Sequence, residues 1–150
     1  MLKSILVPVD GSVHANAAVD FASDLAAKFG AGVLVVNVIT KVGSDRVPED
    51  LKSYVELERM QVTERDLLQG AANEIVANAA KRARGRGAAS VEALTAVGDP
   101  AQTIVQIAKE RKVDLIAMGR RGLGGVKTLL LGSVSHKVSQ LAECACLTVA

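Results

Sequence analysis

Hydrophobic residues occur along this chain in short runs that alternate with longer segments of helical periodicity. Several runs are apolar at every position, which is typical of strands buried on both faces of a parallel sheet. The runs predict five strands, at residues 5–9, 32–39, 91–97, 113–118 and 146–149. The strict alternation of strand and helix favours an α/β fold with helices on both faces of the sheet and right-handed crossovers.

The first two helical segments begin or end at clear boundary residues. Ser12 is the expected N-cap of the first helix, and Gly30 is its expected end. Its inner stripe consists of Ala15, Ala18, Ala22, Leu25 and Phe29. The second helical region runs from about residue 49 to residue 84. Its strongest apolar face consists of Leu68, Ala71, Ile75 and Ala79. Residues 40–48 break both periodicities and predict a mobile loop.

The third and fourth helices have equally distinct signals. Asp99 can cap a helix, proline at position 100 is tolerated at the first helical position, and Gln102 can complete a capping box. The last helix is expected over residues 133–142, with Val134, Val138 and Leu141 facing inward.

The composition is that of one ordinary globular domain, covering residues 1–150, with 49% hydrophobic and 23% charged residues. A net charge of +2 and 2% aromatic residues argue against a nucleic-acid partner, because both phosphate attraction and base stacking would be weak. No apolar stretch approaches the roughly 20 residues of a membrane span, and the first apolar run is too short for a signal peptide. These features predict a cytosolic protein without a membrane partner.

The cysteines, the histidines and one basic segment are expected to have structural roles. Cys144 and Cys146 have no further cysteine or histidine cluster to complete a zinc site, so they are expected to be core thiols. His14 and His136 have no paired acid or nucleophile, so no catalytic residue is assigned. The basic residues at 81–86 lie at the C-terminus of a helix, where the helix dipole favours cations, and this is preferred to a nucleic-acid-binding role.

The candidate functional residues are those that follow the first and fourth strands, because ligands of open parallel sheets bind beyond the carboxyl ends of the strands. Asp10-Gly11-Ser12 follows the first strand, and a glycine-rich segment at 119–125 follows the fourth. Glycines allow backbone N–H groups to approach an oxyanion, and Gly132-Ser133 opens a helix whose N-terminus attracts negative charge. Further phosphate donors are Arg120, Arg121, Lys127, Ser133 and Ser135.

Two alternatives remain open from these residues alone. The glycine-rich segment is either a phosphate cradle or a plain turn, since it matches neither the Walker A loop nor the Rossmann fingerprint. Asp10 either contacts a ligand or only caps the first helix.

The spacing Gly119-x2-Gly122-x9-Gly132-Ser133, with Ile5 to Ser12 and Leu130 to Ser135, resembles the nucleotide-binding branch of the universal stress protein family. This resemblance implies an open five-stranded parallel sheet of order 3-2-1-4-5, Rossmann-like and similar to the adenine nucleotide alpha hydrolases. It also implies that ATP, or AMP or ADP, binds between strands one and four, with Mg²⁺ or Mn²⁺ carried on the phosphates.

The resemblance implies a role for each matching residue. Asp10 would contact the ribose or the adenine edge. The residues enclosing the base would be Pro8, Val9, Val38 and Met118. Those around the phosphates would be Gly119, Gly122, Gly132, Ser133, Val134 and Ser135. The roles of Arg120, Arg121 and Lys127 rest on charge alone.

The expected function is that of a nucleotide-dependent switch or sensor in the stress response. Two alternatives are a slow ATPase and a nucleotide-free dimeric interaction module. A homodimer is expected through the final strand, residues 144–150, because an edge strand without charge, proline or glycine is open to pairing. No protein-built metal site is expected.

Overall fold

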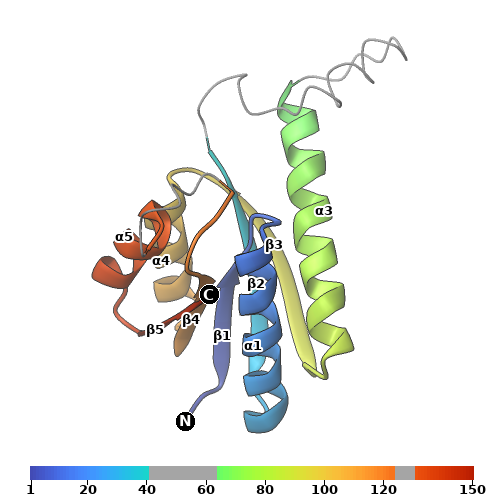
Figure 1. Cartoon of the computed structure of the whole chain (residues 1–150), viewed down its shortest axis with the longest axis vertical. Helices are drawn as coiled ribbons and strands as arrows, with labels where there is room; N and C mark the ends of the chain where they lie inside the picture. Colours follow the sequence, from blue (N-terminus) through green and yellow to red (C-terminus); the bar gives the residue numbers. More distant parts are fainter. Residues whose placement is uncertain (41–63, 124–130) are drawn as a thin grey trace.

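A computed structural model describes residues 1–40, 64–123 and 131–150 of the chain (Figure 1). The strands are β1 (Ser4–Pro8), β2 (Gly32–Ile39), β3 (Ser90–Val97), β4 (Leu115–Gly119) and β5 (Ala145–Val149). The helices are α1 (Val13–Phe29), α3 (Glu64–Gly85), α4 (Pro100–Glu110) and α5 (Ser133–Leu141). The predicted loop at 41–48, the first part of the second helical region and Lys127 lie outside the described residues.

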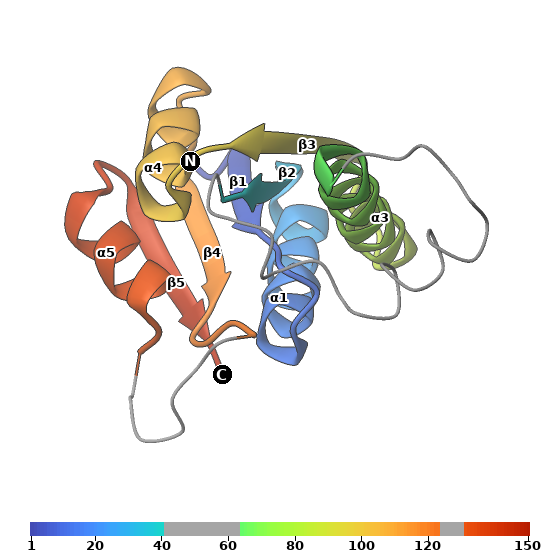
Figure 2. The same cartoon turned by 90° about the horizontal axis from the view of Figure 1, so that it is seen from above.

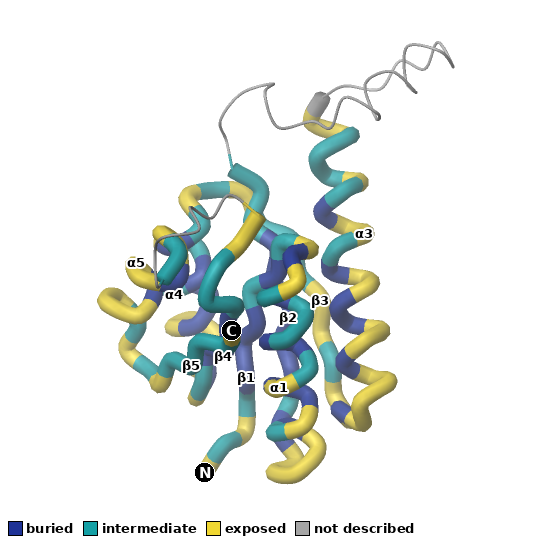
Figure 3. The backbone as a smooth tube through the Cα atoms, viewed as in Figure 1, coloured by how far each residue is buried: buried dark blue, intermediate teal, exposed yellow. Residues whose placement is uncertain are grey.

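The five strands form one parallel sheet of order β3-β2-β1-β4-β5, which confirms the predicted fold class. Helices α1 and α3 cover one face, and α4 and α5 cover the other (Figure 2). Successive side chains of a strand point to opposite faces. Ile5 and Val7 therefore pack beneath α1 and α3, whereas Leu6 packs beneath α4 and α5, and all three are fully buried (Figure 3).

The predicted caps of α1 and α4 are confirmed. Ser12 Oγ accepts a hydrogen bond from the Ala15 N–H at 3.2 Å, and α1 ends at Gly30, whose φ of 69° is left-handed. The Asp99 carboxylate accepts from the Gln102 N–H at 3.0 Å, so the backbone of Gln102, not its side chain, makes the capping contact. These caps fix the starting points of both helices at the carboxyl ends of strands.

The buried face of α3 is shifted by one residue from the predicted one. It consists of Ala72, Val76, Ala79, Ala80 and Ala83. Of the predicted stripe only Ala79 is buried, and Leu68, Ala71 and Ile75 are half-buried. The first turns of α3 extend past the sheet (Figure 1), where Leu68 has less to pack against. The alanines lie where α3 lies close to α1 and the sheet, because small side chains permit a close approach.

Helix α5 also differs from the expected orientation. Val138 is fully buried as predicted, but Val134 and Leu141 are 37% and 53% exposed, so their inward placement is wrong. Ser135 is buried instead, and its hydroxyl bonds to backbone carbonyls. Hydrogen bonding of this serine sets the inner face of a short helix that apolar periodicity alone assigned differently. In the described part of the chain, no helix is long and apolar enough to cross a membrane.

Candidate functional site

The sheet is weakly paired between β1 and β4, where the strand order reverses. β1 pairs with β2 along its whole length, from Ser4 to Pro8. It pairs with β4 at only two positions, Ile5 with Leu115 and Leu6 with Ile116. The carboxyl ends of β1 and β4 are therefore not joined to each other. This is the topological switch point at which open parallel sheets bind ligands.

Asp10 links the turns that follow these two strands. Its Oδ1 accepts a hydrogen bond from the Ser12 N–H at 2.9 Å, and its Oδ2 accepts from the Leu123 N–H at 3.1 Å. Ser12, rather than Asp10, caps α1. The carboxylate thus holds the glycine-rich turn against the start of α1. Asp10 is half-buried, so its outer side remains accessible.

Two of the motif glycines lie in close contact with other parts of the chain. A Cβ at Gly119 would lie 2.7 Å from the carbonyl carbon of His14 and 2.8 Å from the nitrogen of Ala15, both backbone atoms of α1. A Cβ at Gly122 would overlap Oδ2 of Asp10. These glycines therefore let the turn after β4 lie directly against α1 and Asp10.

The turn after β4 also meets the start of α5. The Arg120 carbonyl accepts from the Gly132 N–H at 2.8 Å and from the Ser135 hydroxyl at 3.0 Å. The Arg120 N–H donates to the Val149 carbonyl at 2.7 Å, which joins the same turn to the end of β5. The backbone of Arg120 thus holds the α5 N-terminus beside the carboxyl end of β4.

The N-terminus of α5 has free donors. Gly132 is its N-cap and offers no side-chain cap, whereas α1 and α4 each have one. The N–H groups of Ser133, Val134 and Ser135 have no partner within the described residues, and the first turn contains no acidic residue. Unpaired N–H groups and the helix dipole together favour an anion at this position.

Two arginines add uncompensated positive charge beside these donors. Arg82, Arg86 and Arg111 form ion pairs, but Arg120 and Arg121 have no carboxylate partner in the described part of the chain. The Nε atoms of Arg120 and Arg121 are buried without a hydrogen-bond partner there. Buried donors of this kind are costly to leave unpaired, so the turn is suited to an anionic ligand.

The residues expected to enclose an adenine base differ in burial: two belong to the core and two lie half-buried at strand ends. Val9 and Met118 are 5% and 3% exposed and belong to the cores on opposite faces of the sheet. Pro8 and Val38 are half-buried at the ends of β1 and β2. The structure thus brings Pro8 and Asp10 to the switch point, while Met118 supports it from within the core.

Sequence reasoning missed two residues near this site. Asn37 is buried in β2 and its Nδ2 donates to the Val9 carbonyl at 2.7 Å, which fixes the backbone just before Asp10. An asparagine within an otherwise apolar strand is a signal of such a bond, because buried amides need partners. His14 lies in the first turn of α1 against Gly119, and its Nδ1 is buried without a partner in the described residues.

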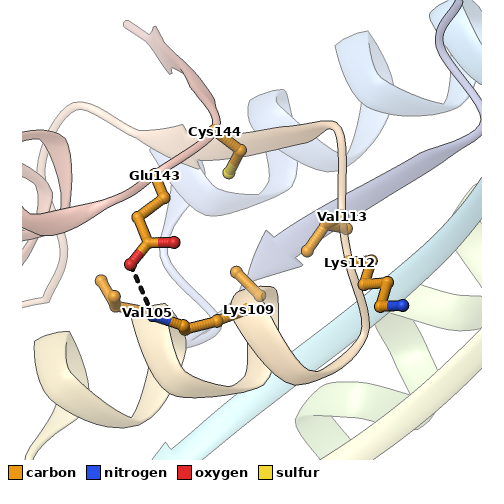
Figure 4. A pocket seen from close by; sticks show the side chains of 7 residues that line it. Val105, Lys109, Lys112, Val113, Glu143 and Cys144 are labelled. Atoms are coloured by element: carbon orange, nitrogen blue, oxygen red, sulfur yellow. Dashed lines mark hydrogen bonds and ion pairs between the residues drawn. The ribbon is translucent and has the colours of Figure 1, made fainter.

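Two hollows lie at the other end of the sheet, near the amino ends of the strands. The larger, of about 280 Å³, is bounded by the second half of α4 and the segment before β5 (Figure 4). The smaller, of about 170 Å³, adjoins Ser4, Gly32 and Ser90 at the starts of β1, β2 and β3. Neither coincides with the switch point, where the glycine-rich turn lies only partly within the described residues. Among the described side chains, no group of three or more metal-binding residues occurs.

Comparison with known proteins identifies the family. The family model described as "Universal stress protein family" matches residues 1–150. The chain is 36% identical to universal stress protein YxiE of Bacillus subtilis, with 99% of each chain covered. It is 37% identical to a universal stress protein of Thermus aquaticus, again with 99% of each covered. A solved universal stress protein in complex with cAMP has a TM-score of 0.73 and 28% identity, covering 99% of this chain and 97% of that one. The chain belongs to the universal stress protein family.

Proposed function

We propose that this protein binds an adenine nucleotide at the switch point between β1 and β4 and acts as a nucleotide-dependent switch in the stress response. The observation that carries the proposal is the uncapped N-terminus of α5, held beside the turn after β4 by the Arg120 carbonyl. The solved relative that contains cAMP supports an adenine nucleotide over other anions.

The phosphates would be held by backbone donors and by the two arginines. Ser133, Val134 and Ser135 offer N–H groups that lack partners within the described residues. Arg120 and Arg121 follow Gly119 directly and supply positive charge. Guanidinium groups and helix N-termini both bind phosphate strongly, so these residues fit the group. Mg²⁺ or Mn²⁺ would arrive with the phosphates rather than on protein carboxylates.

Asp10 would position the nucleoside while it holds the glycine-rich turn. Each of its carboxylate oxygens already accepts one backbone hydrogen bond, from Ser12 and from Leu123. A carboxylate oxygen has two lone pairs, so each can accept a further bond from a ribose hydroxyl or an adenine amino group. Asp10 would then both bind the ligand and hold the glycine-rich turn in place.

The decisive experiment is a direct search for the nucleotide. Purified full-length protein is extracted with acid, and the released nucleotides are separated by chromatography. The emptied protein is then titrated calorimetrically with Mg-ATP, ADP, AMP and cAMP. Retention or micromolar binding of an adenine nucleotide supports the proposal, and release of phosphate from ATP would indicate the slow-ATPase alternative. If the purified protein contains no nucleotide and binds none of the four ligands, the proposal of nucleotide binding is contradicted. The alternative of a nucleotide-free interaction module then remains.

We also propose that two copies pair through β5. In the described sheet β5 is an edge strand, paired with β4 alone. Charged residues, prolines and bulge-forming glycines normally protect an edge strand from pairing with another chain. The residues of β5, Ala145 to Val149, include none of these. A second copy could satisfy the free edge across a two-fold axis. The two free thiols, Cys144 and Cys146, fit a reducing cytosolic location.

Ala145 offers a clean test of this dimer. Leu147 packs against the core beneath α1, so a charge there would damage the fold as well as the edge. Ala145 is exposed, and Ala145→Lys places a charge at the edge strand itself. Light scattering should show a shift from dimer to monomer, while Ala150→Lys, just beyond the strand, should remain dimeric. A wild-type chain that is monomeric at micromolar concentration removes this proposal.

A further inference from the structure

Three side-chain nitrogens in the described part of the chain are buried without a hydrogen-bond partner. They are Nδ1 of His14 and the Nε atoms of Arg120 and Arg121, which come from segments far apart in the sequence. All three residues meet at the end of β4, because Arg120 and Arg121 follow Gly119 and His14 contacts that glycine from α1. Buried polar groups are normally paired, so this clustering indicates a shared acceptor outside the chain.

The position of His14 is fixed by the packing of α1 against β4. Ser12 caps α1, so His14 lies in the first turn of the helix. A Cβ at Gly119 would lie 2.9 Å from the Cβ of His14 and 2.7 Å from its carbonyl carbon. The lack of a side chain at Gly119 therefore lets His14 approach the turn after β4. His14 is half-buried, so part of the residue stays accessible while Nδ1 is enclosed.

The chain supplies no acidic partner for this imidazole within the described residues. The two carboxylates nearest to it in sequence are already engaged. Asp10 accepts hydrogen bonds from the two turns that it links, at 2.9 and 3.1 Å, and Asp20 accepts one from Arg82 at 2.6 Å. His14 forms no hydrogen bond or ion pair with either residue. The imidazole is therefore available to a ligand.

Phosphate is the acceptor that fits these nitrogens. Guanidinium and imidazole N–H groups both donate to phosphate oxygens, and one phosphate group offers several oxygens to donors that approach from different directions. Donors flank the turn after β4 from both faces of the sheet, since α1 with His14 packs on one face and α5 packs on the other. A ligand that reaches donors on both sides needs more than one phosphate.

We propose that His14 is a phosphate-binding residue, whose imidazole donates a hydrogen bond to an outer phosphate of the nucleotide beside Arg120 and Arg121. This inference rests on the proposed nucleotide binding at the switch point and adds to it a contact from the side of α1. It favours nucleoside di- and triphosphates over AMP and cAMP, because a single phosphate held at the N-terminus of α5 leaves His14 without a partner.

Because the chain has two histidines, NMR of the imidazole rings tests this contact directly. Full-length protein with isotope-labelled histidine gives ring signals from His14 and His136 alone, and His136→Gln assigns them. Mg-ATP should shift the ring nitrogens of His14, inorganic tripolyphosphate should shift them in the same direction, and AMP should shift them less. His136 is exposed on α5 and serves as the internal reference. Unshifted His14 signals with both ATP and tripolyphosphate overturn the proposal.

Matched substitutions separate the ring nitrogen from the shape of the side chain. His14→Phe keeps a ring without nitrogen, whereas His14→Asn keeps a nitrogen at the same number of bonds from Cα as Nδ1. We expect His14→Phe and His14→Ala to weaken ATP binding by at least about tenfold in calorimetric titration, and His14→Asn to recover most of the affinity. Urea unfolding checks that the packing against Gly119 is intact.

The outcomes distinguish this inference from the proposed function. Equal ATP affinity in wild type and His14→Phe overturns the contact from His14 and leaves nucleotide binding standing. A wild-type chain that binds no nucleotide contradicts the proposed function, and the His14 shifts with tripolyphosphate then decide on the phosphate contact alone.

Discussion

The Oδ2 atom of Asp10 accepts a hydrogen bond from the N–H of Leu123 at 3.1 Å, although 113 positions separate these residues. This bond joins the turn after β1 to the turn after β4. A Cβ at Gly122 would overlap the same oxygen, so a side chain there would require the Asp10 carboxylate to move. The position of the glycine-rich turn therefore depends on a charged acceptor at residue 10.

Replacement of Asp10 tests this dependence. In Asp10→Ala the Leu123 amide loses its acceptor, so we expect its hydrogen exchange to accelerate even without ligand. Nucleotide affinity should fall by about tenfold, since a hydrogen bond to a charged group contributes about 1.5–3 kcal/mol. NMR-detected exchange and calorimetry measure the two effects. Unchanged Leu123 exchange would contradict the linking role, and equal selectivity for ribose- or adenine-modified analogues would limit Asp10 to that role.

Gly119 should be intolerant of any side chain. In Gly119→Ala the new methyl group would meet the α1 backbone at His14 and Ala15, and overpacking against rigid atoms costs about 1–3 kcal/mol. Urea unfolding measures the loss. Gly70→Ala is the matched control, because nothing lies within 4 Å of a Cβ there and alanine favours helix α3 by up to about 1 kcal/mol. Equal stability of both variants would show that the contact at Gly119 is easily relieved.

Arg120 and Arg121 should contribute more to the affinity for a nucleotide the more negative charge that nucleotide carries. We expect Arg120→Gln and Arg121→Gln each to weaken ATP binding by about tenfold and AMP binding by less, because charge-assisted hydrogen bonds to phosphate are lost. Calorimetric titration at two salt concentrations measures the difference. Arg65→Gln, on the exposed start of α3, is the control and should have no effect. An equal loss for ATP and AMP would place both arginines away from the outer phosphates.

The contact between α1 and α3 should weaken in acid. The hydrogen bond from Arg82 holds the pKa of Asp20 below its ordinary value of 3.8, despite an opposing effect of burial. A lowered folded-state pKa contributes stability that is present above the ordinary value and is lost as pH falls below it. Asp20→Asn should therefore flatten the loss of unfolding free energy below about pH 4. At neutral pH it should cost no more than about 1 kcal/mol.

Urea unfolding across this pH range, at low and high salt, measures both quantities. Glu74→Gln is the control, because Glu74 is exposed on α3, the helix of Arg82, and has no ion pair in the described part of the chain. The same slope in wild type and Asp20→Asn would show that the ion pair contributes nothing to acid stability.

Much of the fold could be predicted from local sequence patterns, namely helix-capping residues and apolar runs. Ser12 and Asp99 cap their helices as predicted, and the apolar runs are strands to within two residues. Strand order did not follow from periodicity, because pairing between distant segments leaves no local pattern. It came from the family resemblance, and the structure confirms it.

Other features escaped prediction because they depend on contacts between distant segments. The inner face of α5 is set by the Ser135 hydroxyl bonding to the Arg120 carbonyl, which apolar periodicity does not encode. The close contact of Gly119 with α1 is equally invisible in the sequence, where the residue reads only as part of a glycine motif. The ligand-binding roles of the motif residues remain predictions.

The two-residue pairing of β1 with β4 divides the sheet into halves that are each continuous in sequence. Strands β1 to β3 belong to residues 4–97, and strands β4 and β5 belong to residues 115–149. A ligand bound across this seam would contact Asp10 from one half and the start of α5 from the other. Its binding energy would then be shared by both halves, which the apolar clusters also join, from Ile5 to Ala117 on one face of the sheet and from Leu6 to Ile116 on the other. The seam is thus the place where a bound ligand would add a connection that the backbone hydrogen bonds of the sheet do not supply.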